Sequence, residues 1–215
     1  MRQPVENIEP PTLPRSMRDP EARAVRRAML DLPHIMPLAK FAADLRVRHN
    51  IEVPDFDPLD GGIRSRILFL KEKPGPMTST SRSGRVGSGF ISRDNDDPTA
   101  EATFLFMQAA GIPRDDTLMW NVVPGWNGTR KITRQELIEG VAEVRNLMKL
   151  LPDIEVVVLV GKKAARAEPL LEGTGVIIRH SLHNSPLVRA SRPEEWARIP
   201  AVWGEAYSKI THKLA

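Results

Sequence analysis

The sequence predicts an α/β fold, a three-layer α/β/α sandwich around a short, four-stranded, mainly parallel sheet. Continuous apolar runs such as residues 67–70 and 156–160 are typical of parallel strands that are buried on both faces. Stretches with helical hydrophobic spacing separate these runs, and strands that alternate with helices are the pattern of α/β folds.

The N-terminal part predicts an arm followed by two helices. Residues 1–20 are rich in proline and polar side chains, which favours an arm without regular structure. Asp19 suits the N-cap of a helix and Pro20 suits its first turn, so we expect a helix from there to about residue 32. A second helix is expected over residues 34–49.

The rest of the chain predicts strands and helices in turn. The expected strands cover residues 63–71, 117–123, 154–160 and 176–182. The expected helices cover residues 97–111, 133–151 and 162–171, with a last helix from residue 193 onward. Residues 71–96 form a long loop rich in glycine, and loops of this length in a compact domain are usually functional or disordered.

Size and composition limit the class of protein. The chain has 215 residues, of which 41% are hydrophobic and 27% are charged, as in soluble globular proteins. This length fits one compact unit, a monomer, in which an N-terminal arm and helices (residues 1–60) pack on an α/β domain (residues 61–215). No apolar run reaches the roughly 18 residues typical of a membrane helix, so no membrane partner is expected.

The chain contains no cysteine. This excludes disulfides, a thiolate nucleophile, an Fe–S cluster and any cysteine-based zinc site. The histidines do not cluster either, so we expect no metal and no cofactor. The N-terminal residues lack the apolar segment of a secretory signal, which together with the absence of cysteine favours the cytoplasm.

Basic residues gather in the long loop, mixed with glycine, serine and threonine. They are Lys71, Lys73, Arg82, Arg85 and Arg93. Lys, Arg and small hydroxyl side chains are those that contact phosphate backbones, so the loop suggests a nucleic-acid partner. The net charge of +4 is modest, and solubility alone also explains it.

Polar segments follow three of the predicted strands, and sites in parallel sheets form at the carboxyl ends of strands. These segments are Lys71-Glu72-Lys73-Pro74-Gly75, Asn121-Val122-Val123-Pro124 and His183-Asn184-Ser185-Pro186-Leu187. We expect the strand before His183 to be buried. Each segment alone could be an ordinary turn, but their combination at one edge of the sheet predicts a functional site.

Together these segments resemble the uracil-DNA glycosylase superfamily. Residues 71–75 are similar to its first motif, G-E-A-P-G in the thermophile-type branch and G-Q-D-P-Y in the classical branch. Residues 90–94 resemble its aromatic segment, Asn121 its N-x-V segment, and residues 183–187 its H-P-S-P-L segment. The likeness spans residues 63–189 and is nearest to a bacterial branch that is related to the thermophile-type enzymes but free of their cluster.

The resemblance implies a monofunctional DNA repair glycosylase. It would flip uracil, or another deaminated or damaged base, out of single- or double-stranded DNA and hydrolyse the N-glycosidic bond, leaving an abasic site. The departing base becomes an anion, for which His183 is the implied hydrogen-bond donor. The sugar becomes a cation, for which Asp94 is the implied carboxylate, with its neighbour Asn95 able to share the catalytic role.

Other residues have implied binding roles. Asn121 would pair with the edge of the base and Phe90 would stack on its ring. The base pocket would include Glu72, Lys73, Pro74 and Gly75. DNA contacts would come from Ser185, Pro186, Leu187, Val188 and Arg189, with Leu187 as a wedge, and from Arg82 and Arg85 on phosphates.

The chain departs from the family pattern at three positions. Lys73 stands where relatives have Asp, Asn or Ala, so the catalytic carboxylate must come from elsewhere, either Asp94 or one of Glu72, Asp96 and Asp97. Asn184 replaces a proline, from which we expect a looser His183 loop. Gly75 stands where the classical branch has the tyrosine that excludes 5-methyl groups, from which we expect a wider base pocket.

Two other functions stay open. A module of the same fold could bind damaged or abasic DNA with weak or no excision, and this alternative gains if Asp94 cannot approach the sugar. An unrelated α/β nucleotide-binding protein would carry G-x-G-x-x-G after the first strand, and residues 71–76 do not match it.

Overall fold

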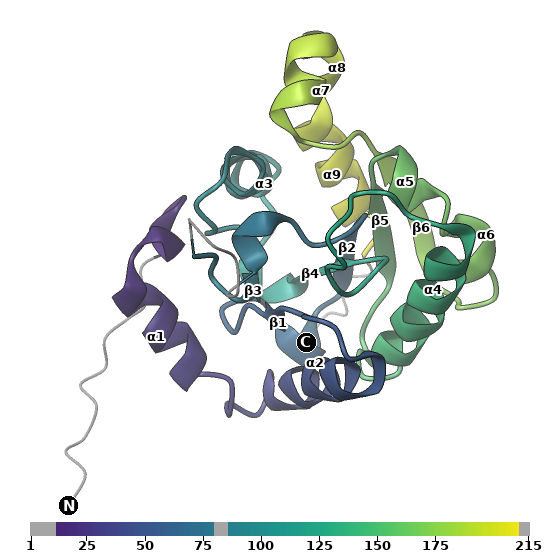
Figure 1. Cartoon of the computed structure of the whole chain (residues 1–215). Helices are drawn as coiled ribbons and strands as arrows, with labels where there is room; N and C mark the ends of the chain where they lie inside the picture. Colours follow the sequence, from purple (N-terminus) through teal and green to yellow (C-terminus); the bar gives the residue numbers. More distant parts are fainter. Residues whose placement is uncertain (1–11, 80–85, 211–215) are drawn as a thin grey trace, which may run out of the picture.

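The architecture is a parallel sheet flanked by helices, as the sequence predicts. A computed structural model describes residues 12–79 and 86–210 (Figure 1). The strands lie in the order β4 (Thr117–Asn121), β2 (Ile67–Lys71), β5 (Val156–Val160) and β6 (Ile177–Ser181), and each neighbouring pair is parallel. The α/β class and the four-stranded sheet are therefore confirmed.

The central strands are apolar because helices cover both of their faces. The side chains of residues 67–70 in β2 and of all five residues of β5 are fully buried. Strand β6 lies at the edge of the sheet and is partly exposed, with Ile177 37% exposed. The expectation that a buried strand precedes His183 is therefore wrong, since that residue follows an edge strand.

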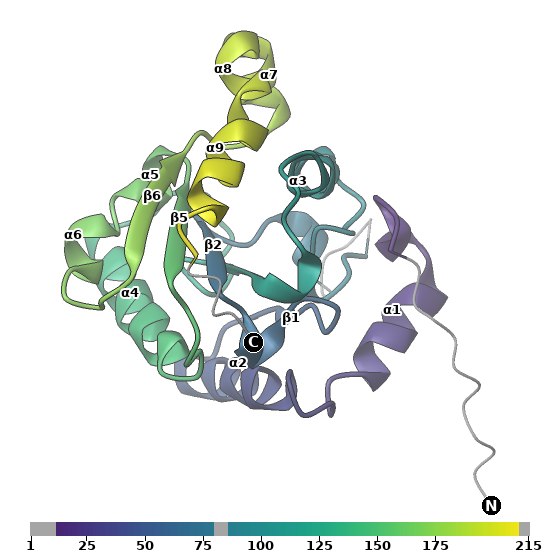
Figure 2. The same cartoon turned by 180° about the vertical axis from the view of Figure 1, so that it is seen from behind.

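Helices cover the two faces of the sheet in separate groups. Helices α3 (Pro98–Ala109) and α9 (Ile199–Tyr207) lie on one side, and α4 (Arg134–Met148), α5 (Lys162–Ala165) and α6 (Glu168–Leu171) lie on the other (Figures 1 and 2). Helix α4 begins with a capping box formed by Thr133 and Glu136. It buries Leu137, Val141, Val144 and Leu147 in the core.

Of the two N-terminal helices, α2 (Met36–His49) belongs to the same core. Helix α1 (Pro20–Ala28) starts where the sequence predicts, because the Asp19 side chain accepts a hydrogen bond from the backbone N–H of Glu21 at 2.9 Å. Helix α2 contributes Leu38, Phe41 and Leu45 to the core that the strands share. Helix α2 thus packs with the sheet.

A second, two-stranded sheet lies beside the first. Strand β1 (Asp55–Phe56) pairs in parallel with β3 (Phe90–Ile91), within the segment that the sequence predicts to be a loop. The Phe56 ring stacks on Trp120 of β4 with ring centroids 3.9 Å apart. This contact fixes the 90–95 segment relative to the main sheet.

Several short elements differ from the prediction. The expected helix over 162–171 is split into α5 and α6, because Pro169 has no backbone N–H to continue a helix and instead starts a new one. Helix α7 (Pro186–Ser191) was not expected. It projects with α8 (Pro193–Ala197) from the body of the molecule (Figure 1). Single 3₁₀ turns occupy Ser16–Arg18, Gly62–Arg64, Pro76–Thr78 and Arg114–Asp116.

Two predictions concern the N-terminal arm and the membrane. The predicted arm lies outside the described residues as far as residue 11, and its remainder includes a 3₁₀ turn. Among the helices of residues 12–79 and 86–210, none combines the length and apolar character needed to cross a bilayer.

Candidate functional site

A cleft opens at the carboxyl ends of the strands. Its volume is about 850 Å³. The lining residues follow β2, β4, β5 and β6 in the chain, and others come from the segment before α3 and from its first turn. Segments that are distant in sequence therefore meet at one edge of the sheet, as the strand-end rule predicts.

Most residues that the sequence points to lie on this cleft. They are Glu72, Lys73, Pro74, Gly75, Asn95, Asn121, His183, Ser185, Pro186, Leu187 and Val188. Asp94, Phe90 and Arg189 do not line it. Arg82 and Arg85 lie outside the described residues.

His183 presents a neutral imidazole to the cleft. Burial lowers its pKa to about 4, and the positive charges of Lys71, Lys163 and Arg130 act in the same direction. At neutral pH the ring therefore carries one N–H and no charge, although cations surround it. Such a ring can donate a hydrogen bond to a group that becomes negative, and the surrounding cations also favour that negative charge.

Gly161 leaves the space that this ring occupies. Its φ is +92° and its ψ 159°, a backbone region that glycine alone adopts readily. A Cβ at this position would lie 3.0 Å from the Cβ of His183 and 3.2 Å from its Cδ2. The turn after β5 thus needs glycine both for its backbone and for its contact with His183.

We expect Gly161→Ala to lower the free energy of unfolding by about 1–3 kcal/mol and to displace the imidazole of His183. Urea unfolding measures the first effect, and the NMR signals of the His183 ring measure the second. Gly173→Ala is the matched control. Its φ of +77° is also strained, but a Cβ there meets no described atom within 4 Å. Unchanged His183 signals in Gly161→Ala would contradict the contact.

Asn184 holds the His183 loop in place through hydrogen bonds and does not make it looser. Its side chain is fully buried, and its Nδ2 donates to the Thr103 Oγ1 at 2.8 Å and to the Thr99 backbone oxygen at 3.0 Å. Both acceptors belong to α3. The expectation of a looser loop is therefore wrong, because the amide that replaces the family's proline ties this loop to a helix.

Two further amides border the cleft. Asn121 ends β4 beside Lys71 of β2 and is 3% exposed. Asn95 donates through Nδ2 to the backbone oxygen of Phe90 at 2.9 Å, which leaves its buried Oδ1 without a hydrogen-bond partner in the described part of the chain. An amide can both donate and accept, so these side chains can recognise the polar edge of a bound ring.

Glu72 supplies a carboxylate at the cleft. Its Oε1 accepts from the Nζ of Lys163 at 3.1 Å, and the same amine donates to the backbone oxygen of Arg130 at 3.1 Å. Asp97 also lines the cleft, but its Oδ1 caps α3 by accepting from the backbone N–H groups of Thr99 and Ala100. Glu72 is therefore the carboxylate there that does not cap a helix.

Lys73 holds a loop in place. Its Nζ donates to Glu136 Oε1 at 2.7 Å, to Asn127 Oδ1 at 2.9 Å and to the backbone oxygen of Lys131 at 3.2 Å. Burial acts to raise the pKa of Glu136, but hydrogen bonds from Lys73 and Thr133 lower it to about 2. With these acceptors engaged, Lys73 binds the loop that carries Arg130 to the end of β2.

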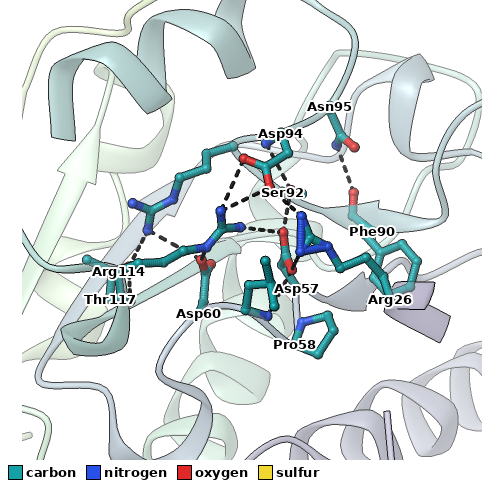
Figure 3. A network of polar contacts seen from close by, with 12 residues as sticks. Arg26, Asp57, Pro58, Asp60, Phe90, Ser92, Asp94, Asn95, Arg114 and Thr117 are labelled. Atoms are coloured by element: carbon teal, nitrogen blue, oxygen red, sulfur yellow. Dashed lines mark hydrogen bonds and ion pairs between the residues drawn. The ribbon is translucent and has the colours of Figure 1, made fainter. Parts of the chain in front are cut away.

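The structure contradicts the catalytic role expected of Asp94. This side chain is fully buried, and both of its oxygens are held by guanidinium groups (Figure 3). Arg26 Nη2 lies 2.6 Å from Oδ2, and Arg114 Nη1 lies 2.9 Å from Oδ2 and 3.2 Å from Oδ1. A carboxylate so enclosed cannot stand beside a sugar in the cleft.

Asp94 belongs instead to a buried ion-pair network. Its carboxylates are Asp57, Asp60 and Asp94, and two of its guanidinium groups are Arg26 and Arg114 (Figure 3). Arg93, which pairs with Asp60, supplies the third guanidinium group. The charges balance within this set, which is how buried ions are tolerated. The network joins α1 and the 57–60 segment to residues 92–95, and thereby holds Asn95 at the cleft.

The structure also contradicts the stacking role expected of Phe90. Its ring is fully buried, and the Arg27 guanidinium lies 5.5 Å from the ring centroid. The next residue, Ile91, lines the cleft instead. Successive residues of a strand point to opposite faces, so the side chain that faces the cleft is the aliphatic one of Ile91 and not the aromatic ring.

The residues after His183 form the rim. Ser185 caps α7 and Pro186 occupies its first turn, which leaves Leu187 78% exposed beside the cleft. Arg189 does not line the cleft, and its guanidinium lies 5.1 Å from the Trp196 ring centroid. An exposed leucine at a cleft mouth is suited to insertion into an apolar or stacked partner.

Several lining residues have no role assigned from the sequence. Lys162 and Lys163 come after Gly161 at the end of β5, and the strand-end rule selects residues 161–163 without indicating what these lysines do. Arg130 and Met119 also line the cleft. No sequence pattern near Arg130 predicts a place on the cleft. Met119 belongs to β4, whose apolar sequence predicts a buried core strand.

The comparisons with known proteins give similarity to solved structures. No family model matches the chain, and no curated protein matches it. Among solved structures, the chain is similar to the solution NMR structure of a candidate uracil DNA glycosylase from Methanosarcina acetivorans. The identity is 19%, the match covers 69% of this chain and 94% of that chain, and the TM-score is 0.48.

Proposed function

We propose that this protein is a DNA glycosylase that excises uracil and leaves an abasic site. The observation that carries the proposal is the neutral His183 imidazole, set among Lys71, Lys163 and Arg130 in a cleft that Asn121 also borders. Cleavage of an N-glycosidic bond places negative charge on the departing base. A neutral donor surrounded by cations is suited to that charge.

The base would be recognised by its polar edge. The Asn121 amide can accept from N3–H of uracil and donate to O4, while His183 donates to O2. The hydrogen bond from His183 would strengthen as O2 gains negative charge. It would therefore lower the barrier rather than only hold the substrate.

The carboxylate of Glu72 would stabilise the sugar cation. With Asp94 enclosed in the buried network and the Asp97 Oδ1 engaged as a helix cap, Glu72 is the carboxylate of the described cleft that we assign to this role. It can also orient the attacking water. The hydrogen bond from the Nζ of Lys163 would hold this carboxylate in position.

The DNA would lie across the cleft mouth. Lys162 and Arg192 border the cleft and can contact phosphates, and Leu187 can fill the space that a flipped nucleotide leaves.

The test is excision from an oligonucleotide that contains a single uracil. We expect alkali-labile strands in EDTA, because the proposed reaction uses no metal or cluster. Binding to the same oligonucleotide is measured alongside. Tight binding without excision by the wild-type protein would contradict the glycosylase and support a second candidate function, a DNA-binding module.

The second candidate is a module that binds damaged or abasic DNA without efficient excision. The burial of Asp94 favours it, since the carboxylate implied by the resemblance is absent from the cleft. Glu72→Gln separates the two, because glutamine keeps the size of the side chain but removes its charge. A glycosylase would lose excision and keep DNA binding, whereas a binding module would show no excision to lose.

The pH profile tests the protonation state of His183. Because its pKa is lowered to about 4, the neutral donor persists as the pH falls from 7 to 5. We therefore expect kcat/KM for excision to lack an acid limb near pH 6.5, the ordinary pKa of histidine, since this parameter reports the free enzyme. An acid limb near 6.5 that disappears in His183→Asn would contradict a neutral donor.

Gly75 bears on the range of bases. A Cβ added there meets no described atom within 4 Å, so a larger side chain has room at the cleft wall. We expect the wild-type protein to excise 5-substituted uracils and Gly75→Tyr to reject them while still excising uracil. Gly75→Ala is the control and should keep the full range. A wild-type protein that accepts uracil alone would refute the wider pocket.

A further inference from the structure

Lys71 differs from the other partly or fully buried lysines of the cleft. It is the last residue of the central strand β2 and is partly buried at the cleft. Its Nζ donates to the Thr103 Oγ1 at 2.9 Å, and within the described residues no carboxylate forms an ion pair with it. Lys73 and Lys163, in contrast, each donate to a glutamate.

The position of Lys71 places its amine among groups that would hold a flipped nucleotide. It is the register partner of Asn121 across β2 and β4, and its charge acts on His183. Thr103, its acceptor, also binds Asn184 of the His183 loop. One hydroxyl thus links the amine to the loop that carries the proposed donor.

The electrostatic setting favours a reactive amine. Burial lowers the pKa of Lys71 to about 8, with Asp97 acting to raise it and Arg93 acting to lower it further. A neutral amine is a nucleophile, and desolvated lysines without a carboxylate partner are those that form imines with carbonyl compounds.

The proposed reaction would supply such a carbonyl compound. An abasic deoxyribose opens to a chain with an aldehyde at C1′, and that carbon is the atom that the base has just left. The aldehyde would therefore form in the cleft, close to His183 and Asn121.

We propose that the Nζ of Lys71 forms a reversible imine with C1′ of the abasic product. The inference rests on the proposed function, because that function places this sugar in the cleft. The amine nitrogen attacks C1′, the carbonyl oxygen leaves as water with the two amine protons, and a C=N bond remains. One water molecule reverses the reaction and releases the abasic strand. No oxidant or reductant is needed.

The experiment uses an oligonucleotide with a preformed abasic site and sodium borohydride, which reduces an imine to a stable secondary amine. We expect a covalent protein–DNA adduct with the wild-type protein, and mass spectrometry of its peptides should place the DNA on Lys71. Lys71→Arg should lower the adduct yield roughly tenfold or more, because a guanidinium keeps the charge but not the nucleophilic amine. Lys149→Arg is the control, since this exposed lysine binds Asn146 at the end of α4.

The outcomes separate this inference from the proposed function. Excision of uracil without any trapped adduct would overturn the imine and leave the glycosylase standing. An adduct on Lys71 without excision of uracil would support the imine and overturn the glycosylase. An adduct that maps to Lys162 or Lys163 would also overturn the inference. Peptide mapping of the wild-type adduct does not depend on whether Lys71→Arg folds, which thermal unfolding measures separately.

Discussion

Replacing His183 with alanine is expected to slow uracil excision about 10²–10³-fold under single-turnover conditions. The change removes the donor that we propose for the base anion, and loss of one such preorganised donor typically costs about 3–4 kcal/mol of transition-state stabilisation. Binding to abasic DNA should change little. The cations of the rim and the exposed Leu187 stay in place.

His180→Ala is the matched control for this variant. His180 lies on β6 in the same stretch of chain, but it is exposed and its Nε2 lies 2.9 Å from Glu168. Its loss should leave the excision rate unchanged. Full activity in His183→Ala would remove the assigned donor, and equal losses in both variants would indicate damage to β6 instead of lost chemistry.

Replacing Arg26 with methionine is expected to lower the free energy of unfolding by about 3–5 kcal/mol, the usual cost of removing one partner from a buried ion pair. Arg26 is fully buried in α1, with its Nη2 2.6 Å from Asp94 and its Nη1 3.6 Å from Asp57. The variant leaves those carboxylates with less compensating charge. Urea unfolding provides the measurement.

Two companion variants decide what the loss means. Arg27→Met alters the adjacent, exposed arginine, whose side chain contacts Phe90 and the backbone of Ser88, and it should cost less than about 1 kcal/mol. Adding Asp94→Asn to Arg26→Met should recover part of the stability, because it removes a buried carboxylate that has lost one of its two guanidinium partners and keeps only Arg114. No recovery, or an equal loss in Arg27→Met, would argue against the network.

The strands of the sheet and the starts of two helices could be predicted because their sequence signals are local. The apolar runs of β2 and β5, the Asp19 cap and the capping box at Thr133 each act within a few residues. The carboxyl-end rule then brings Glu72, Asn121 and His183 to one edge without further information. The edge position of β6 could not be predicted in this way, because the order of strands depends on packing between distant segments.

The burial of Asp94 in an ion-pair network could not be predicted, because no local sequence pattern reveals its partners. Arg26 and Arg114 lie 68 and 20 residues away in the chain, and only the folded structure brings both guanidinium groups to one carboxylate. The stacking role expected of Phe90 is wrong for a related reason, since the register of the two-residue strand β3 decides whether Phe90 or Ile91 faces the cleft.

Asn184 shows a similar limit of motif comparison. Read as a substitution for proline, it suggests a looser loop, but its amide finds acceptors on α3 that the motif does not include. The Ser185-Pro186 pair was also interpreted as a DNA contact, although serine followed by proline is equally a helix start and caps α7 here.

The proposed function requires that the cleft break the bond between uracil and deoxyribose. The most direct measurement is free uracil, quantified by mass spectrometry after a uracil-containing oligonucleotide is incubated with excess protein in EDTA. We predict that the wild-type protein releases uracil in step with the appearance of alkali-labile strands, and that His183→Ala releases it about 10²–10³-fold more slowly. Bound DNA with no uracil released by the wild-type protein, or equal release by both proteins, would contradict this account.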